Sequence, residues 1–160
     1  RYNGNIRVFL GYSSVPKNSK IKIDLYKEKK IIKNMKNFQK IVNKWKLNKK
    51  IFLTKLTKKF GPLPAKAFPG RASIIINLLG LDKNTISHVY EKNFSLKTNK
   101  FVPGTDIKIL KEKFFNYNER KKGIIINLAW HISSEIRHYL KKNLKFNGKV
   151  IDIISNKDFK

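Results

Sequence analysis

The chain has 160 residues, 41% of them hydrophobic, and a formal net charge of +27. That is enough apolar chain for one folded core. The absence of cysteine excludes disulfide bonds, thiolate zinc sites and a cysteine nucleophile. No apolar run is long enough to cross a bilayer and the opening residues lack a signal-peptide pattern, so we expect a cytoplasmic protein with no membrane partner.

The positive charge has two interpretations. Clustered basic residues drive nucleic-acid binding, because neutralising phosphates releases counterions. Here the excess is mostly lysine, spread along the whole chain and accompanied by many Ile and Asn residues. A genome rich in A and T codons gives the same composition without an acidic partner, so the sequence does not favour nucleic acid as a partner.

The first 62 residues predict a strand and a long helix. Residues 5–10 (NIRVFL) form a β-branched and aromatic run that ends at a glycine, which is typical of a strand. From about residue 27 to 59, apolar residues recur every three or four positions, which predicts an amphipathic helix or two helices joined near Asn48. We expect this stripe to be buried or, without its neighbour, to cause self-association. Its members are Ile31, Met35, Phe38, Val42 and Trp45.

The remainder predicts an alternating α/β domain. The stretch 61–70 (GPLPAKAFPG) contains three prolines and ends the long helix. Continuous apolar strands that alternate with helices indicate a mostly parallel, Rossmann-like sheet with helices on both faces. The expected strands are 63–68, 86–91, 105–110, 123–129 and 149–154, and the expected helices are 71–80, 111–117 and 131–143.

Two turns of this domain are candidate ligand contacts. Pro69 and Gly70 lead into a helix whose first turn carries Arg71, and a helix N-terminus with a fixed positive charge suits an anion. The alternative is that this proline and glycine only shape the turn. The turn Pro103-Gly104-Thr105 follows two apolar residues, and it is either a ligand-facing loop or a purely structural turn.

A third candidate follows the most apolar strand, where α/β sheets place their ligands. Trp130 and His131 come directly after this strand. His131, Glu135 and His138 have helical spacing, which metal sites use, although a fourth ligand is missing. The other interpretation is that His131 caps the helix or forms a hydrogen bond across a cleft, with Glu135 orienting it.

Four segments, in order, resemble the S-adenosylmethionine-dependent sugar C-methyltransferases. NGNIR at 3–7 is similar to the strand that closes their central domain, and FPGRASIIINLLGL at 68–81 to a glycine-containing segment of their C-terminal domain. VYEKNFSLKTNKFVPGTDIKI at 89–109 is similar to a stretch ending in PGTxIPI, and NLAWHISSEI at 127–136 to an LAWN/H…EI signature.

The resemblance implies that 1–12 is the last strand of a central methyltransferase domain, 13–62 a helical connector and 63–160 the C-terminal domain. Lys66 falls where the family has an aromatic residue, and Ala72 replaces a glycine. The implied partner is a nucleotide-linked sugar, together with the enzyme's N-terminal and central domains. The candidate substrate-binding residues are Arg71, Ser73, Asn77, Lys97, Pro103, Gly104, Thr105, Trp130, His131 and Glu135.

The implied cofactors belong to the intact enzyme: S-adenosylmethionine and possibly zinc, whose domains have no counterpart in this sequence. We therefore expect no cofactor, no catalytic residue and no methyl transfer in this chain alone. A different possibility is a stand-alone basic module that binds nucleotides or nucleic acid. Upstream sequence discriminates the two, because a zinc cluster and a glycine-rich donor loop indicate the enzyme.

Overall fold

A computed structural model describes residues 25–116, 121 and 123–159. The strand predicted at 5–10 and the segment 1–12 lie outside this described part. Within it, no helix is long and apolar enough to cross a membrane. The elements in chain order are α1 (Leu25–Phe60), β1 (Leu63–Lys66), α2 (Gly70–Leu79), β2 (Ile86–Glu91), β3 (Lys108–Lys111), η1 (Glu112–Phe114), β4 (Ile124–Asn127), η2 (Trp130–Ile132), α4 (Ser133–Asn143), β5 (Lys149–Asp152) and η3 (Asn156–Phe159).

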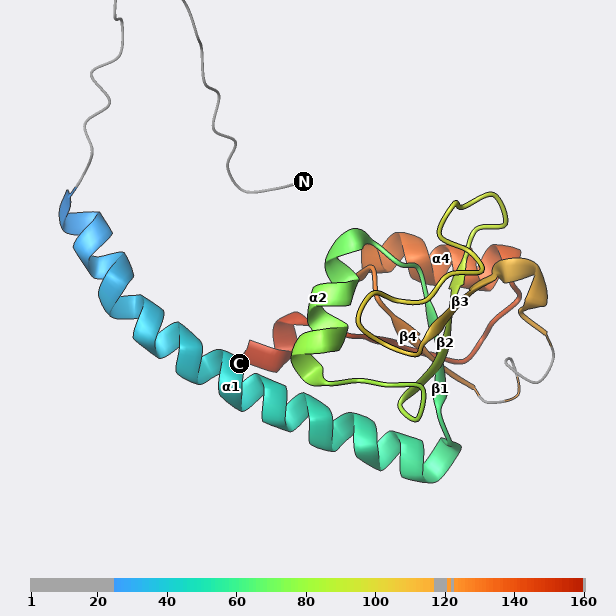
Figure 1. The fold of residues 1–160 in the computed structure, drawn as a ribbon, viewed down its shortest axis with the longest axis horizontal. Helices are drawn as coiled ribbons and strands as arrows, with labels where there is room; N and C mark the ends of the chain where they lie inside the picture. Colours follow the sequence, from blue (N-terminus) through green and yellow to red (C-terminus); the bar gives the residue numbers. More distant parts are fainter. Residues whose placement is uncertain (1–24, 117–120, 122, 160) are drawn as a thin grey trace, which may run out of the picture. The chain divides into compact units, whose positions relative to one another are not determined.

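The five strands form one parallel sheet in the order β3-β2-β1-β4-β5 (Figure 1). An isolated antiparallel bridge joins Phe101 to Lys108 at the start of β3. The α/β class predicted from alternating apolar runs is therefore confirmed. Its cause is burial on both faces, which requires strands such as β4 to be apolar at nearly every position.

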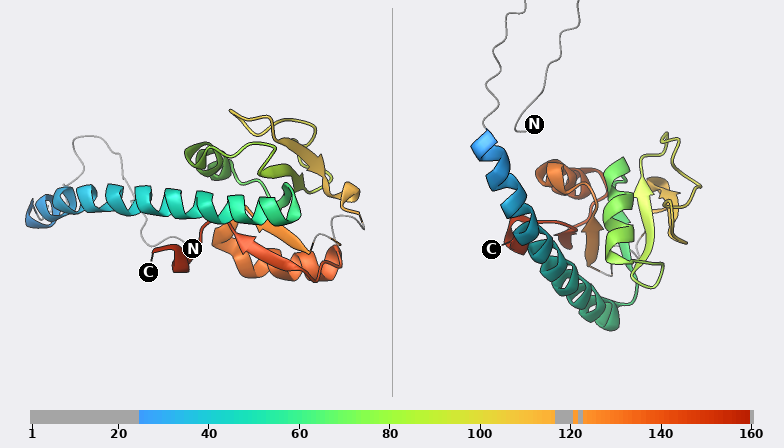
Figure 2. Two further views of the ribbon diagram at one scale, coloured as in Figure 1. Left: turned by 90° about the horizontal axis from the view of Figure 1, so that it is seen from below. Right: turned by 60° about the vertical axis from the view of Figure 1, so that its left-hand side comes forward.

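Helices cover both faces of the sheet. Along β4, Ile124 and Ile126 pack on the side that carries α2, whereas Ile125 packs on the opposite side with Leu140 of α4. The left view in Figure 2 shows α2 and α4 on opposite sides of the strands. The domain is thus a three-layer α/β/α structure.

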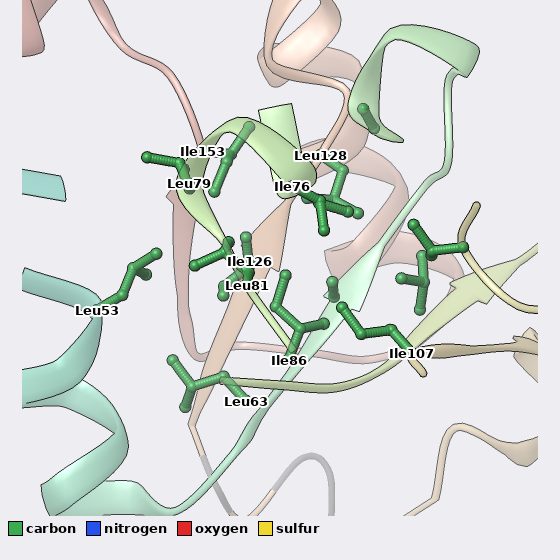
Figure 3. Packing of buried hydrophobic residues seen from close by; sticks show 14 of the residues in the cluster. Leu53, Leu63, Ile76, Leu79, Leu81, Ile86, Ile107, Ile126, Leu128 and Ile153 are labelled. Carbon is green, nitrogen blue, oxygen red and sulfur yellow. The ribbon is translucent and has the colours of Figure 1, made fainter. Parts of the chain in front are cut away.

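The larger core lies between the sheet and the layer formed by α2 and the later turns of α1 (Figure 3). Ile76, Leu79 and Ile126 are fully buried in it, and Leu53 reaches it from α1. Full burial of a Leu or Ile side chain stabilises a fold by roughly 1.5–3 kcal/mol. This core therefore fixes α2, and with it the residues at the N-terminus of α2.

Helix α1 is continuous, so the alternative of two helices joined near Asn48 is not what the structure shows. The chain divides into two compact units, 1–36 and 37–160, and the later turns of α1 belong to the second. In that unit Trp45 is 4% exposed and Val42 packs against the core, whereas Phe38 is 63% exposed. The predicted stripe is therefore buried only in its later part, and self-association stays a prediction.

The predictions for the segment 105–117 differ from the structure. The strand predicted at 105–110 begins only at Lys108, because Thr105 closes a turn in which its hydroxyl donates to the Val102 carbonyl at 2.9 Å. The helix predicted at 111–117 is a single 3₁₀ turn, η1. Its last residue, Phe114, precedes an extended Phe115 that is buried beneath α4.

Candidate functional site

The strand order places a topological switch point between β1 and β4. From β1 the chain proceeds to β2 and β3 on one side, and from β4 it proceeds to β5 on the other. Lys66 and Asn127, the last residues of β1 and β4, are partners in register. In open α/β sheets ligands bind outside the carboxyl ends of strands at such a point. The candidate site therefore comprises the segments that follow these two strands.

Internal hydrogen bonds fix the turn from β1 to α2. Ala67 has a positive φ of 64°, and its N–H donates to the Tyr90 carbonyl at 3.0 Å. The Phe68 N–H donates to the Glu91 carboxylate, and Lys97 Nζ donates to the Phe68 carbonyl at 2.7 Å. Sequence reasoning included Lys97, and the structure brings it to this turn. The turn is consequently held by one carboxylate and one ammonium group.

Arg71 lies in the first turn of α2 and is exposed. No side chain caps this helix end, and its first turn has no acidic residue. The helix N-terminus carries a partial positive charge, to which Arg71 adds a full one. The Ser73 hydroxyl donates to the Gly70 carbonyl at 2.9 Å, back onto its own helix. The geometry at this end suits an anionic group.

The turn at 103–105 packs against the opposite end of α2. Asn77 Nδ2 donates to the Pro103 carbonyl at 2.9 Å and to the Ser73 carbonyl at 2.8 Å. Gly104 has a φ of 77°, and a Cβ there would lie 2.6 Å from Asn77 Oδ1, so only glycine fits. Asn77 lies six residues beyond Arg71, about 9 Å along the helix. The structure thus brings Asn77, Pro103 and Gly104 together in a structural contact, and their role in substrate binding stays a prediction.

A polar network holds the segment after β4. Asn127 is fully buried; its Oδ1 accepts the Ala129 N–H at 2.9 Å, and its Nδ2 donates to Asp152 at 2.7 Å. Asp152 also accepts the Ser133 hydroxyl at 2.8 Å and Arg137 Nη2 at 2.7 Å. This carboxylate, at the end of β5, therefore fixes where the chain leaves β4 and where α4 begins.

Trp130 and His131 lie in η2, directly after this network. Trp130 is half-buried, His131 is exposed, and their rings make an edge contact with centroids 5.9 Å apart. The predicted helix 131–143 begins only at Ser133, so His131 does not share a helix with Glu135 and His138. That removes the spacing on which the metal interpretation rested. Within the described residues, no group of three His, Cys, Asp or Glu side chains could hold a metal ion.

Glu135 lies on α4, where it accepts the Ser134 hydroxyl at 2.9 Å. With His138 and Tyr139 it lines a shallow hollow of about 400 Å³. This hollow lies along α4, whereas Arg71 and Lys97 lie at the turn after β1. The predicted site residues therefore fall into three groups: those of the β1–α2 turn, the Asn77 contact and those after β4.

Sequence reasoning missed a buried lysine at the end of β1. Lys66 is 3% exposed, and its Nζ lies 2.7 Å from Glu112 Oε2. The Tyr139 hydroxyl donates to Glu112 Oε1 at 2.7 Å, and the Tyr139 ring lies 5.2 Å from Lys66 Nζ. Burial, followed by the hydrogen bond to Glu112 and the charge of that carboxylate, raises the pKa of Tyr139 to about 12.

The signal for this cluster was the position of Lys66, a lysine that ends the buried strand LPAK. In a chain with 37 Lys and Arg residues, the sequence does not distinguish this lysine from the others. The cluster places a paired cation next to the switch point. Together with Lys97 and Arg71 it gives the carboxyl edge of β1 a cationic character, and the nearby Glu91 and Glu112 carboxylates are engaged within the protein.

A comparison with protein-family models gives a match over most of the chain. The model of the C-methyltransferase C-terminal domain matches residues 3–154. A search of curated proteins finds no match. Since the family model covers nearly the whole sequence, the chain belongs to the C-methyltransferase C-terminal domain family.

Proposed function

We propose that this chain is the nucleotide-sugar-side domain of an S-adenosylmethionine-dependent sugar C-methyltransferase. The observation that carries the proposal is the acid-free N-terminus of α2, with Arg71 exposed at the switch point of a C-methyltransferase family sheet. A nucleotide-linked sugar carries a pyrophosphate, and helix N-termini with an adjacent arginine suit such groups. The proposed enzyme is cytoplasmic, with which a cysteine-free chain agrees.

The β1–α2 turn supports a division of labour in which the methyl donor binds elsewhere. Dinucleotide-type sites use a glycine-rich turn and an acidic residue about 20 residues later, which binds a ribose hydroxyl. Here Gly70 stands alone, and Glu91, at the end of β2, accepts the N–H groups of Phe68 and Lys92. A ribose would have to compete with these bonds. We therefore assign S-adenosylmethionine, and zinc if it is present, to other domains of the enzyme.

In this proposal the chain binds and orients the substrate while another domain performs the chemistry. A base removes a proton next to the sugar ketone, and the resulting enolate carbon attacks the donor methyl group. A carbon–carbon bond forms as the carbon–sulfur bond breaks, and S-adenosylhomocysteine leaves. The contribution of this chain is to fix the nucleotide end, so that the reacting carbon is held in place.

The first test compares Arg71→Ala with Lys142→Ala in the intact enzyme. Lys142 is exposed in the last turn of α4, which leads away from the carboxyl edge of the strands. Loss of a charge-assisted contact costs on the order of 1.5–3 kcal/mol, so Arg71→Ala should weaken nucleotide-sugar affinity roughly ten- to a hundredfold. The KM for the sugar should rise and donor affinity should stay unchanged. Equal losses for the two variants would show that diffuse charge binds the substrate.

The second test titrates S-adenosylmethionine into the 160-residue chain by calorimetry. We expect no binding at micromolar concentrations, because the β1–α2 turn offers no donor-cradling loop. Micromolar binding would contradict the division of labour. It would leave the Arg71 test unaffected, so the two parts of the proposal can fail separately.

A basic module that binds nucleic acid is the second candidate, and the net charge of +27 is the observation that favours it. Such binding falls steeply with salt because counterions are released. The test measures the affinity for a random RNA at several salt concentrations. Binding at 150 mM salt, with a salt dependence that corresponds to several released ions, would favour this candidate if Arg71→Ala does not weaken it.

A further inference from the structure

A second cavity lies beside β5, and its lining includes Arg137 and Asp152 of the network that follows β4. It has a volume of about 700 Å³, within the range of small-molecule sites. The middle of α1, β5, Arg137 of α4 and the C-terminal turn η3 surround it, and Figure 1 shows that turn, in red, next to α1. All of these elements belong to the compact unit 37–160. We call this cavity the β5 pocket.

One wall of the β5 pocket contains a buried donor. Trp45 lines the pocket and is 4% exposed, and its indole Nε1 has no hydrogen-bond acceptor among the described residues. Its ring stacks on Phe159 of η3, with centroids 6.0 Å apart and planes at 27°. A buried donor without an acceptor costs about 1–3 kcal/mol, so such a group calls for an explanation. An acceptor on a ligand in this pocket would supply one.

The charges of the β5 pocket are unbalanced. Lys49 Nζ lies 2.9 Å from Asp158, and Arg137 Nη2 lies 2.7 Å from Asp152, so both carboxylates of the lining are already paired. Lys149 and Lys157 complete the lining; both are exposed, and neither forms an ion pair with a described residue. Such flexible ammonium groups suit a phosphate, which lysine binds as a point charge.

The rest of the lining combines apolar side chains with the polar residues Asn48, Ser155 and Asn156. Phe52 lies on the same side of α1 as Trp45, seven residues or about two turns later, and Val150 and Ile151 of β5 lie across from them. Phe52 is 40% exposed, and planar rings stack favourably on such a side chain. The pocket thus combines a surface for a ring, a donor for an acceptor on that ring and two cations for a phosphate.

We infer that the β5 pocket binds a phosphorylated heteroaromatic molecule of the nucleoside monophosphate class. The ring stacks on Phe52 and meets the Trp45 indole edge on, so that one ring acceptor receives the in-plane indole N–H, and the phosphate lies between Lys149 and Lys157. Reaching Nε1 requires a small displacement of η3, which the Lys49–Asp158 pair and the Trp45–Phe159 stack hold in place. This inference is independent of the nucleotide-sugar site proposed at the switch point.

The test uses the 160-residue chain labelled with ¹⁵N and three probes: adenosine monophosphate, adenosine and inorganic phosphate. The sequence has two tryptophans, so the spectrum has two indole N–H signals, and Trp45→Phe assigns the one from Trp45. We expect adenosine monophosphate to shift the Trp45 signal saturably downfield. Adenosine and phosphate should each bind at least tenfold more weakly, because each lacks one half of the contacts.

Two double variants with equal charge loss provide the control. Lys149→Ala with Lys157→Ala should weaken adenosine monophosphate binding at least tenfold, while Lys141→Ala with Lys142→Ala on α4 and the single Arg71→Ala change it less than twofold. All four lysines are exposed, so both double variants should fold. A Trp45 signal that does not move, equal losses in the two doubles, or inorganic phosphate binding as well as the nucleotide would each overturn the inference.

Discussion

Two lysines, Lys66 and Lys49, are buried in the described part of this domain, and the elements that surround them differ. Lys66 ends the central strand β1, and Glu112 neutralises it while also receiving the Tyr139 hydroxyl. Lys49 lies on α1 beside the β5 pocket, and its partner Asp158 sits in the C-terminal turn η3. The first cation lies among a strand, a 3₁₀ turn and a helix, whereas the second pairs across to the single 3₁₀ turn η3.

This difference implies that Lys66 has a structural charge, whereas the charge of Lys49 can become accessible to water. Burying an ion pair costs desolvation, and removing one partner leaves an uncompensated charge. Around Lys66, hydrating the ammonium group requires a movement of β1, η1 or α4. Around Lys49, a movement of η3 can hydrate the ammonium group, and that same movement exposes the indole of Trp45. The comparison predicts that loss of the acidic partner has unequal consequences in the two regions.

The largest expected effect is that of Glu112→Ala. Lys66 is 3% exposed and Glu112 11%, so the variant leaves a buried cation unpaired and removes the acceptor of Tyr139. We expect unfolding in urea to show a loss of about 3–5 kcal/mol. Lys66→Met together with Glu112→Leu should recover most of it, because both charges then disappear. A loss below about 1 kcal/mol for the single variant would show that water reaches this cluster.

Asp158→Ala should cost less, on the order of 1–3 kcal/mol. Lys49 is 7% exposed and Asp158 17%, and Asp158 also accepts the Ser155 N–H at 2.7 Å. The freed lysine can be hydrated if η3 moves, so part of the penalty is avoided. Hydrogen exchange should therefore accelerate at residues 155–159 without accelerating in β1. A penalty as large as that of Glu112→Ala would contradict the distinction between the two regions.

A smaller effect is expected at alkaline pH in the Lys66 region. Burial and then Glu112 raise the pKa of Tyr139 to about 12, compared with 10 for the free side chain. The folded state thus favours the neutral phenol, so the stabilisation is complete below pH 10 and is lost as the pH rises toward 12. Tyr139→Phe should cost about 1 kcal/mol at pH 7 and less above pH 11. An absorbance titration of the six tyrosines should lose one component with a pKa of about 12 in this variant.

The sequence was sufficient to predict the sheet but not the two lysine regions. Apolar runs such as IIIN of β4 predict strands because burial on both faces demands them, and the positions of β2 and α2 follow from the same rule. The start of β3 was wrong because the Thr105 turn uses side-chain hydrogen bonds that no apolar period reveals. The start of α4 was wrong because η2 intervenes before Ser133.

The clusters themselves depend on contacts between distant residues. Lys66 and Glu112 are 46 residues apart, and Lys49 and Asp158 are 109 apart. In a chain with 37 basic residues, nothing local distinguishes a lysine that will be buried from one that will be solvated. The position of Arg71 at the start of α2 could be predicted because its signal is local: a proline, a glycine and an arginine at the start of an apolar helix. Distant charge pairing has no such signal.

The smallest expected effect is that of Lys83→Ala, which calibrates the comparison. Lys83 Nζ lies 3.4 Å from Asp106, but the side chains are 66% and 48% exposed, so water already screens both charges. Exposed pairs contribute about 0–1 kcal/mol, and 0.5 M salt removes most of that. The Asp106 carboxylate also accepts a hydrogen bond from the backbone N–H of residue 83 at 3.0 Å, and Lys83→Ala does not remove this bond. We therefore expect a change in unfolding free energy below about 0.5 kcal/mol, measured in the same urea series. If Lys83→Ala costs as much as Asp158→Ala, burial does not set the strength of these pairs, and the ranking of Lys66 above Lys49 loses its physical basis.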